Sequence, residues 1–325
     1  MLPRAALRSL LLLPALLGFT SGAWCAEAYP SRPVRVVVAF PPGGISDSLA
    51  RVLSQQLTAA MGQQFVVDNR PGAGTTLAAA LVAKSPPDGL TLYLVDATTH
   101  AINATLYSSL PYDSVRDFTP IAMVAQTPLI LVVHPSLPVR SVRDLIALAK
   151  AQPKQINYAS SGNGTILHLS GETLKSMAGI DLVHVPYKGS GPAVAAVLAG
   201  EISLTFSTTP PALPHVQAGK LRALGVTSAK RSPLLPDVPA MGETLKGFDI
   251  VLYSGVIGPA GIPKDIVEKL HGEITRTLAT SKVKEAWTAY GATPVSMTPE
   301  QFAQHLRSDI AKLGAMVRTA GAKID

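Results

Sequence analysis

Cysteine is almost absent from this chain: Cys25 is the only one among 325 residues, and it lies in an N-terminal segment that we expect to be cleaved off. Without a thiol, the mature protein can form no disulfide, no cysteine nucleophile and no thiolate metal site. A His-Glu-x-x-His zinc motif and a Gly-Lys-[Ser/Thr] phosphate loop are also missing, and Gly189-Ser-Gly191 lacks the spacing of a nucleophile elbow. We therefore expect no catalytic residue, no bound metal and no cofactor.

Charged residues are scarce as well. They make up 15% of the sequence, and the 28 Lys and Arg and 21 Asp and Glu are scattered along it. No basic run is interleaved with aromatic residues, so we expect no binding of nucleic acid. The net charge of +7 gives a mildly attractive field for anions. A hydrophobic content of 47% indicates a globular protein, and the length favours two domains.

Residues 1–28 have the pattern of a signal peptide. Arg4 and Arg8 precede the apolar run Leu10–Phe19, which is too short for a stable membrane span. Ala26-Glu-Ala28 offers small residues at both positions before a cut, which makes Tyr29 the expected mature N-terminus. No later apolar run reaches the roughly 18 residues of a spanning helix. The sequence thus predicts export to an oxidising compartment such as a bacterial periplasm.

Short apolar strands and amphipathic helices alternate along the rest of the chain. The predicted strands include Phe65–Asp68, Leu90–Val95, Leu129–His134, Ile202–Ser207 and Val251–Pro259. Helices are expected over residues 75–84, 141–150, 165–177, 263–278, 283–289 and 299–319. Such alternation is typical of an α/β protein with mainly parallel sheets.

The segment Val34–Arg51 predicts a strand, a tight turn at Gly43-Gly44 and the start of a helix. Ser46 or Asp47 can cap this helix, and its first N–H groups would lie open just beyond the end of the strand. Such a helix start suits an anion, because the N–H groups and the helix dipole both favour negative charge. The alternative is a plain strand-to-helix connection that binds nothing.

Two later segments repeat this pattern. Ile156–Thr165 predicts a short strand and a Ser/Gly turn before the helix that starts at Thr165, and Leu182–Pro192 offers a third candidate anion cradle. The polar run Asp96–His100, which contains Thr98, follows a predicted strand, and α/β sheets place ligands at the carboxyl ends of their strands.

Several polar side chains allow two interpretations. His168 falls on the first turn of the Thr165 helix, where it can point at a ligand or pack. His184 lies within a strand, which favours a structural role. His100, at the end of a strand, can either bind a ligand or have a structural role. The Tyr187-Lys188 pair can face a cleft or end a solvated strand.

A series of motifs then resembles one family, the Bug-type extracytoplasmic receptors of tripartite tricarboxylate transporters. Singly these motifs are weak, but their shared order covers essentially all of residues 29–325. They are Tyr29-Pro-Ser-Arg-Pro-Val, Phe40-Pro-Pro-Gly-Gly-Ile-Ser-Asp47, Val67-Asp-Asn-Arg-Pro-Gly-Ala-Gly74, Lys84-Ser-Pro-Pro-Asp-Gly89, Leu110-Pro-Tyr-Asp-Ser-Val-Arg-Asp-Phe118, Tyr158-Ala-Ser-Ser-Gly-Asn-Gly-Thr165, His184-Val-Pro-Tyr-Lys-Gly189, Ala218-Gly-Lys-Leu-Arg222, Arg231-Ser-Pro-Leu-Leu-Pro-Asp-Val-Pro239 and Gly258-Pro-Ala-Gly-Ile-Pro263.

The resemblance implies a two-lobed periplasmic binding protein of type II topology, whose ligand cleft lies between lobes joined by two crossing strands. We expect residues 129–252 to form lobe 2, and residues 29–128 plus 253–325 to form lobe 1. The expected partners are a small carboxylate solute and the membrane subunits of the transporter, and we expect a monomer. The implied ligand-binding set is Phe40, Gly43, Gly44, Ser46, Asp47, Thr98, Ser160, Gly162, Gly164, Thr165, His168, Ser207 and Tyr253.

Two positions depart from the family pattern. Ser207 stands where many relatives have an aspartate, and Tyr253 where many have a tryptophan. If Ser207 lines the cleft, the missing carboxylate should disfavour solutes that carry an ammonium group. Two alternative functions remain open on the sequence alone: an exported α/β enzyme acting on small organic acids, and a solute-sensing receptor that signals.

Overall fold

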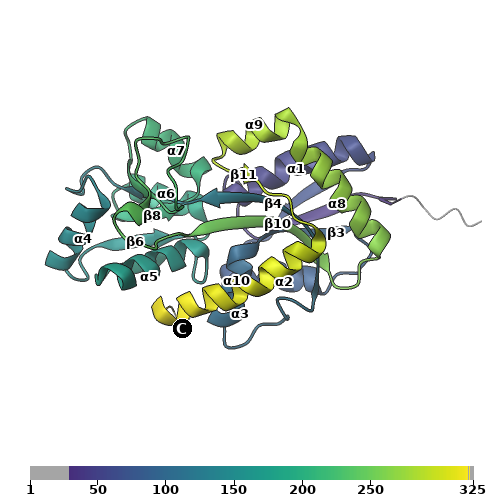
Figure 1. Ribbon diagram of the computed structural model, residues 1–325, viewed down its shortest axis with the longest axis horizontal. Coiled ribbons are helices and arrows are strands. Elements are labelled where there is room, and N and C mark those ends of the chain that lie inside the picture. Colours follow the sequence, from purple (N-terminus) through teal and green to yellow (C-terminus); the bar gives the residue numbers. More distant parts are fainter. Residues whose placement is uncertain (1–28, 321, 323–325) are drawn as a thin grey trace, which may run out of the picture.

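Two β-sheets organise the protein as two lobes (Figure 1). The structure is a computed structural model that describes residues 29–320 and residue 322, so the predicted signal peptide, residues 1–28, lies outside the described residues. The six-stranded sheet of the first lobe has the order β11 (Thr293–Pro294), β4 (Phe118–Pro128), β10 (Val251–Pro259), β3 (Thr91–Asp96), β1 (Val34–Val38) and β2 (Phe65–Asn69). The five-stranded sheet of the second lobe has the order β7 (Val183–Pro186), β6 (Asn157–Ser160), β8 (Leu204–Ser207), β5 (Ile130–Val133) and β9 (Arg222–Val226).

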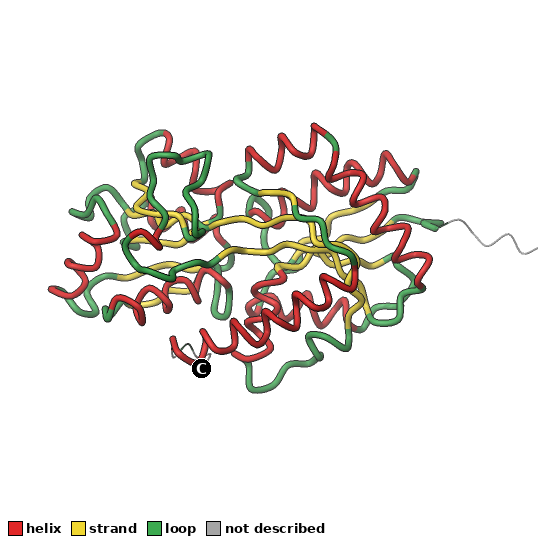
Figure 2. The backbone as a smooth tube through the Cα atoms, in the orientation of Figure 1, coloured by secondary structure: helices red, strands yellow, loops and turns green. Residues whose placement is uncertain are grey.

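Helices cover both faces of the sheets, as the backbone tube shows (Figure 2). The first lobe carries α1 (Ile45–Met61), α2 (Thr76–Ala83), α3 (Ala97–Leu106), α8 (Lys264–Ala279), α9 (Ser281–Ala289) and α10 (Pro299–Ala320), with a short 3₁₀ turn at Ala73–Thr75. The second lobe carries α4 (Val142–Ala151), α5 (Ile166–Ala178), α6 (Ser190–Leu198) and α7 (Thr209–Gln217), with a 3₁₀ turn at Met241–Glu243. Within residues 29–320, no helix combines the length and the apolar character that a membrane crossing needs.

The connection between the lobes is a pair of long antiparallel strands, β4 and β10, which lie side by side in the middle of the molecule (Figure 1). Only Leu129 separates β4 from β5 of the second sheet. Leu129 and Thr227 are held together, because the Leu129 N–H donates to Thr227 Oγ1 at 2.8 Å and the Thr227 N–H donates to the Leu129 carbonyl at 3.0 Å. These two hydrogen bonds therefore link two of the segments where the chain passes between the lobes. The predicted lobe limits at residues 129 and 252 stay a prediction.

Strand β4 and helix α3 were not expected from the sequence, nor were the short strand β11 and the two 3₁₀ turns, and the strand pairing also differs. Strand β4 contains Pro120 and Pro128, and proline within an apolar run argues against a strand because it removes an N–H donor. Helix α3 was missed because its Thr and Asn residues are weak helix formers. The sheets are also less parallel than predicted, since β10 runs antiparallel to β3 and β4, and β5 runs antiparallel to β8 and β9.

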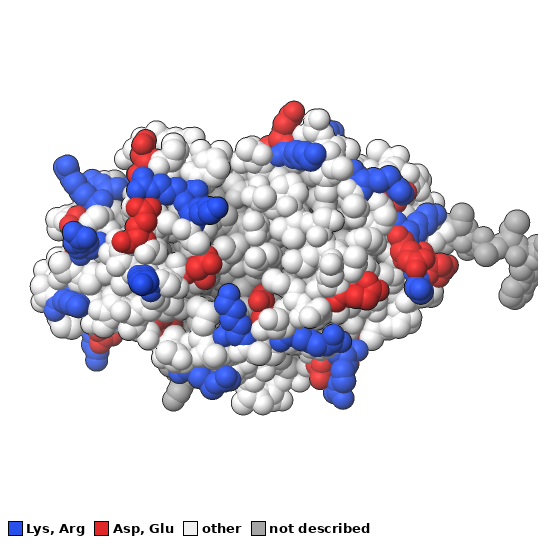
Figure 3. Space-filling view, in the orientation of Figure 1, with Lys and Arg blue, Asp and Glu red and all other residues white. Residues whose placement is uncertain are grey.

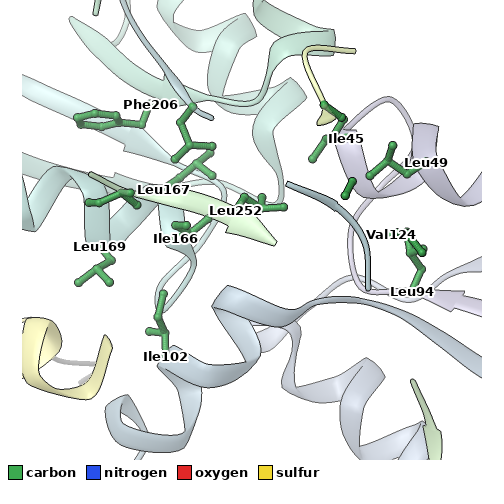
Figure 4. Close-up of a cluster of buried hydrophobic side chains, with 14 of the residues drawn as sticks. Ile45, Leu49, Leu94, Ile102, Val124, Ile166, Leu167, Leu169, Phe206 and Leu252 are labelled. Carbon is green, nitrogen blue, oxygen red and sulfur yellow. The ribbon is translucent and has the colours of Figure 1, made fainter. Parts of the chain in front are cut away.

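One apolar core continues from one lobe into the other (Figure 4). It contains Leu49 and Leu94 in the first lobe and Phe206 in the second, all almost fully buried. Ile45 and Leu252 belong to the same cluster and lie close to where the lobes meet. Each such side chain contributes roughly 1.5–3 kcal/mol of burial free energy. The lobes are thus in close contact in this structure.

The last helix, α10, packs on α3 and β4 and also reaches α5, so a helix of the first lobe contacts the second.

On the face shown in Figure 3, most of the surface is uncharged, and acidic and basic side chains are interspersed. That face therefore presents no extended patch of a single charge.

Candidate functional site

A small cavity of about 30 Å³, partly open to solvent, lies between the two lobes and is called the interlobe cavity here. Its walls come from the starts of several helices. Gly44 is the N-cap of α1, Asp96 of α3, Gly189 of α6 and Thr208 of α7, and all four residues line the cavity. Leu167, on the first turn of α5, lines it too. Five helix N-termini therefore converge on one small space, and the N-terminus of a helix carries a partial positive charge.

The connection between β1 and α1 forms the first-lobe wall. Phe40, Gly44, Ile45 and Ser46 line the cavity, together with the two prolines between Phe40 and Gly43. The N-cap of α1 is Gly44, with φ −83° and ψ 174°, and no side chain caps the helix. The prediction that Ser46 or Asp47 caps it is therefore wrong, because both residues already lie inside the first turn. The first N–H groups of α1 have no partner within the helix, as at every helix start.

Asp47 holds this connection in place instead of lining the cavity. Its carboxylate accepts hydrogen bonds from the Gly43 N–H and from Asn69 Nδ2, each at 3.0 Å, and pairs with Arg51 at 2.9 Å. Burial favours the neutral acid, but the hydrogen bonds from Arg51, Gly43 and Asn69 outweigh it and hold the Asp47 pKa below its usual range. Asp47 is thus a charged anchor for the Gly43 turn, with its oxygens already occupied.

The start of α6 forms the second-lobe wall. Gly189, Ser190, Gly191 and Pro192 line the cavity. Gly189 has φ +122°, and a Cβ there would lie 3.0 Å from Pro41 Cδ of the first lobe, so only glycine fits where the lobes approach so closely. The sequence flagged this segment as a third cradle, but Ser190 and Pro192 were not among the predicted site residues.

Ser207 lies behind Ser190 instead of in the cavity wall. Its hydroxyl donates to the Thr208 carbonyl at 2.9 Å and lies 2.9 Å from Ser190 Oγ, and the Ser207 side chain is fully buried. Ser190 in turn accepts hydrogen bonds from the N–H and the hydroxyl of Thr208. Ser207 can therefore influence a ligand only through Ser190 or Thr208.

The predicted loop at the start of α5 is only partly in the cavity. Ser161 lines it, whereas Gly162 lines a neighbouring outer groove, defined by Gly72–Thr75, Gly162, Asn163, Tyr187 and Lys188. Thr165 is the N-cap of α5 and is buried, and its hydroxyl donates to the Gly162 carbonyl at 2.8 Å. The hydroxyl of Ser160 is 2.7 Å from His184 Nε2.

His168 is part of a buried ring stack. Its ring lies 4.1 Å from the ring of His184, which stacks in turn on Tyr158 at 4.8 Å, and its Nδ1 accepts from the Gly164 N–H at 3.3 Å. Burial lowers the pKa of both histidines, that of His184 to about 3, so both rings are neutral. The structure therefore brings Ser160, Gly164 and His168 together inside the second lobe and not at the cavity.

Thr98 and Tyr253 line a different space, which we call the α10 pocket and which also includes Asp249, Asp309 and Lys312. The Tyr253 N–H donates to Thr98 Oγ1 at 2.8 Å. Because side chains alternate along a strand, Tyr253 points to the opposite face of β10 from Leu252, which lines the cavity. The sequence indicated the right strand but could not show which face meets the cavity.

Asp96 is a cavity residue that was not among the predicted site residues. Its carboxylate accepts from the Thr99 N–H at 2.9 Å and from the Thr99 hydroxyl at 2.6 Å. Burial raises the Asp96 pKa to about 6. Among the described residues that line the cavity, Asp96 is the one ionisable side chain. The sequence signal was present in the polar run Asp96–His100, of which only Thr98 was predicted to bind the ligand.

The described residues contain no group of three or more His, Cys, Asp or Glu side chains that could hold a metal ion. The cavity instead combines neutral hydroxyls and backbone N–H groups with apolar walls. Phe40, Ile45, Leu167 and Leu252 supply the apolar contacts, and Ser46, Ser161, Ser190 and Thr208 supply the hydroxyls. The chemistry of this lining suits a small anion with an apolar body.

The chain is similar to known proteins over most of its length. Residues 49–322 match the family model described as tripartite tricarboxylate transporter family receptor. The protein BugT of Bordetella pertussis is 38% identical over 301 residues, which cover 92% of this chain and 92% of BugT.

Three solved structures are similar over most of the chain. The structure of Rpa4515 from R. palustris with adipate has a TM-score of 0.88 at 37% identity and covers 91% of this chain and 100% of that one. The periplasmic binding protein BugD has a TM-score of 0.86 at 32% identity, covering 91% and 99%. MatC from Rhodopseudomonas palustris with bound malate has a TM-score of 0.85 at 31% identity, covering 89% and 100%.

Proposed function

Since this chain belongs to the tripartite tricarboxylate transporter receptor family, we propose that it is a periplasmic receptor that captures one small carboxylate solute in the interlobe cavity. It would deliver the solute, chemically unchanged, to the membrane subunits of a transporter. The observation that carries the proposal is the convergence of five helix N-termini on a cavity without a basic side chain. The similar structures of Rpa4515 with adipate and MatC with malate support a carboxylate as the class of solute.

Helix starts can hold a carboxylate without a lysine or arginine. The starts of α1 and α6 present N–H groups that the helix itself cannot satisfy, and the dipole of each helix adds a partial positive charge of about one half. The other three starts offer fewer free N–H groups, because Asp96 caps α3, the Ile166 N–H of α5 donates to Thr99, and α7 begins with two prolines after Thr209. Ser46 adds a hydroxyl donor beside the free N–H groups of α1, whereas the hydroxyl protons of Ser190 and Thr208 are used within the protein and these two residues hold the starts of α6 and α7 in place. A carboxylate placed there exchanges water for several oriented donors, and Phe40 and Leu167 contact its apolar part.

The proposed ligand contacts therefore differ from the sequence prediction. We retain Phe40, Gly44 and Ser46, and we add Ser161, Ser190 and Thr208. The remaining predicted residues would act indirectly, by fixing the loops. They are Gly43, Asp47, Ser160, Gly162, Gly164, Thr165, His168 and Ser207 around the cavity, and Thr98 and Tyr253 in the α10 pocket.

We further propose how the lobes move, in which oligomeric state the protein acts and how it is exported. The lobes divide at residues 129 and 252, and they close on the solute by movement about the β4–β10 pair. The protein acts as a monomer. It reaches the periplasm through a signal peptide, residues 1–28, which the similarity to the periplasmic binding protein BugD supports.

Titration of the purified mature protein with a panel of small mono- and dicarboxylates tests the function. We expect stoichiometric binding and thermal stabilisation by at least one acid, with the acid recovered unchanged. Ser190→Ala should weaken that binding about fivefold, because the start of α6 loses the hydroxyl that bonds to Ser207 and Thr208 beside the cavity. Ser228→Ala, at a half-buried serine that is not part of the cavity, is the matched control. A chemically altered acid would contradict the proposal in favour of an enzyme, and no binding by any carboxylate would contradict it outright.

A further inference from the structure

Asp96 reaches the interlobe cavity through the register of the first-lobe sheet. In the pairing of β3 with β10, Asp96 lies opposite Ser254. Leu252 is two residues before Ser254, so the side chains of Asp96, Ser254 and Leu252 project from the same face of the sheet. Leu252 and Asp96 both line the cavity, and that face carries the core cluster of Leu94 and Ile45 (Figure 4). The acid side chain therefore lies on the cavity side of the sheet.

The surroundings of Asp96 contain no cation to neutralise it. Asp96 is 3% exposed, and its hydrogen-bond donors, the N–H and the hydroxyl of Thr99 and the Thr98 N–H, are neutral. The described residues that line the cavity include no lysine, arginine or histidine. A carboxylate accepts about four hydrogen bonds, so these three donors leave acceptor capacity for a further donor. A buried carboxylate without a countercharge favours a positive or hydrogen-donating group beside it.

We propose, as a deepening of the proposed function on which it rests, that Asp96 sets the specificity of the cavity. It selects solutes that carry an ammonium group as well as the carboxylate, and it disfavours solutes with a second carboxylate. The carboxylate of such a solute lies at the starts of α1 and α6, and its ammonium group donates to Asp96. An ammonium that reaches Asp96 forms a charge-assisted hydrogen bond, whereas a second carboxylate there meets a like charge.

This inference reverses an expectation drawn from the sequence alone. Ser207 in place of an acid predicted that solutes with an ammonium group would be disfavoured, on the assumption that Ser207 is the residue that meets them. Ser207 is fully buried behind Ser190, and the acid that lines the cavity comes from β3. The charge of Asp96, and not the missing charge at Ser207, therefore decides whether solutes with an ammonium group are favoured.

Matched solute pairs test the inference at pH 7.5. The pairs are succinate with 3-aminopropanoate, glutarate with 4-aminobutanoate, and adipate with 5-aminopentanoate, and each pair differs only by carboxylate against ammonium at one end. Butanoate and pentanoate serve as monocarboxylate references. We expect the wild type to bind the amino acid of at least one pair about tenfold or more tightly than its diacid, as measured by calorimetry. A wild-type preference for the diacid in every pair overturns the inference.

Two substitutions of Asp96 test whether the preference for an ammonium group arises from this residue. Asp96→Asn and Asp96→Ser both keep a side-chain acceptor for the start of α3, so the helix cap survives. Each should shift the preference about tenfold toward the diacid, and the affinities for the two monocarboxylates measure any general loss of binding. Asp181→Asn removes the same charge from an exposed site beside Lys154 and should leave the preference unchanged. An unchanged preference in both Asp96 variants, with carboxylates still bound, defeats the inference alone, whereas loss of all carboxylate binding by the wild type defeats the proposed function.

Discussion

The backbone N–H of Ile166 donates a hydrogen bond to Thr99 Oγ1 at 3.2 Å, and this bond joins the second lobe to the first. The same Thr99 hydroxyl donates its proton to Asp96 at 2.6 Å, which leaves the lone pairs of the Thr99 oxygen free to accept from the Ile166 N–H. Thr99 is fully buried. One of the open N–H groups of α5 is thereby satisfied by the other lobe in this structure. Under the proposed lobe movement, this bond would be lost when the lobes open.

Thr99→Val should weaken solute affinity about tenfold. Valine keeps the shape of threonine but removes the cross-lobe acceptor, so the Ile166 N–H loses its partner and the closed state becomes less populated. Thr99→Ser keeps the hydroxyl and should stay within about threefold of the wild type. Calorimetry on the three proteins provides the comparison, and equal affinities for the valine and serine variants would show that the bond does not contribute to closure.

Gly189→Ala should impair lobe closure. The residue has φ +122°, and its new Cβ would lie 3.0 Å from Pro41 of the first lobe. We expect a loss of about 1–3 kcal/mol, from the strained backbone and the cross-lobe contact, measured as solute affinity and as the free energy of unfolding. Gly191→Ala is the control on the same helix start, because a Cβ added at Gly191 would meet no atom within 4 Å and its φ is not positive. That variant should retain its fold and gain up to about 1 kcal/mol of helix stability. Equal behaviour of the two variants would rule out a special role for Gly189.

Asp47→Ala should reduce the free energy of unfolding by about 2 kcal/mol at pH 7, because the Gly43 N–H and Asn69 lose a charged acceptor. The Asp47 pKa is lowered in the folded protein, so this contribution is present above the unfolded pKa of the carboxyl and is lost as the pH falls through the folded value. The difference between wild type and variant in urea unfolding should therefore shrink in acid. Arg51→Ala, at a side chain that is 54% exposed, should cost less than about 1 kcal/mol. A constant difference at all pH values would contradict the role assigned to the Asp47 charge.

His100 should make the protein sensitive to acid. It is fully buried, one ring nitrogen, Nε2, lies 2.9 Å from the Ser114 carbonyl, and burial lowers its pKa to about 4. The unfolded chain binds a proton near pH 6.5 and the folded chain does not, so stability is full above that pH and falls toward pH 4, by about 3 kcal/mol in all. His100→Gln keeps a donor near Ser114 and should flatten this dependence. Asp96 opposes the trend, because its pKa is raised to about 6 and its ionisation costs stability as the pH rises from about 4 to 6.

The comparison of His100→Gln with wild type isolates the histidine, since Asp96 is present in both proteins. Urea unfolding at half-unit steps from pH 4 to pH 7.5 gives the two profiles. Parallel profiles for the two proteins would mean that His100 takes up its proton equally in the folded and unfolded states.

Much of the chain is readable from the sequence because the signals are local. The turn at Gly43-Gly44 lies between an apolar run and a helical repeat, and β10 was expected over Val251–Pro259, where it is found. The predicted starts of α4 and α10 lie within one residue of the observed ones. Turn chemistry, capping and hydrophobic period act over a few residues, so they need no knowledge of distant partners.

The site needed the tertiary structure, because its members are selected by pairing and packing between distant segments. Asp96 meets the cavity through its register with Ser254, and a shift of one residue would turn it to the other face of the sheet, where Tyr253 lies. The ring of His168 stacks on His184 inside the second lobe and does not line the cavity, and Ser207 is buried beneath Ser190. The sequence by itself determined the family, the two helix starts and the α/β class, whereas only the folded arrangement decided which side chains face the solute, since the side of a strand or helix that is covered depends on contacts remote in the chain.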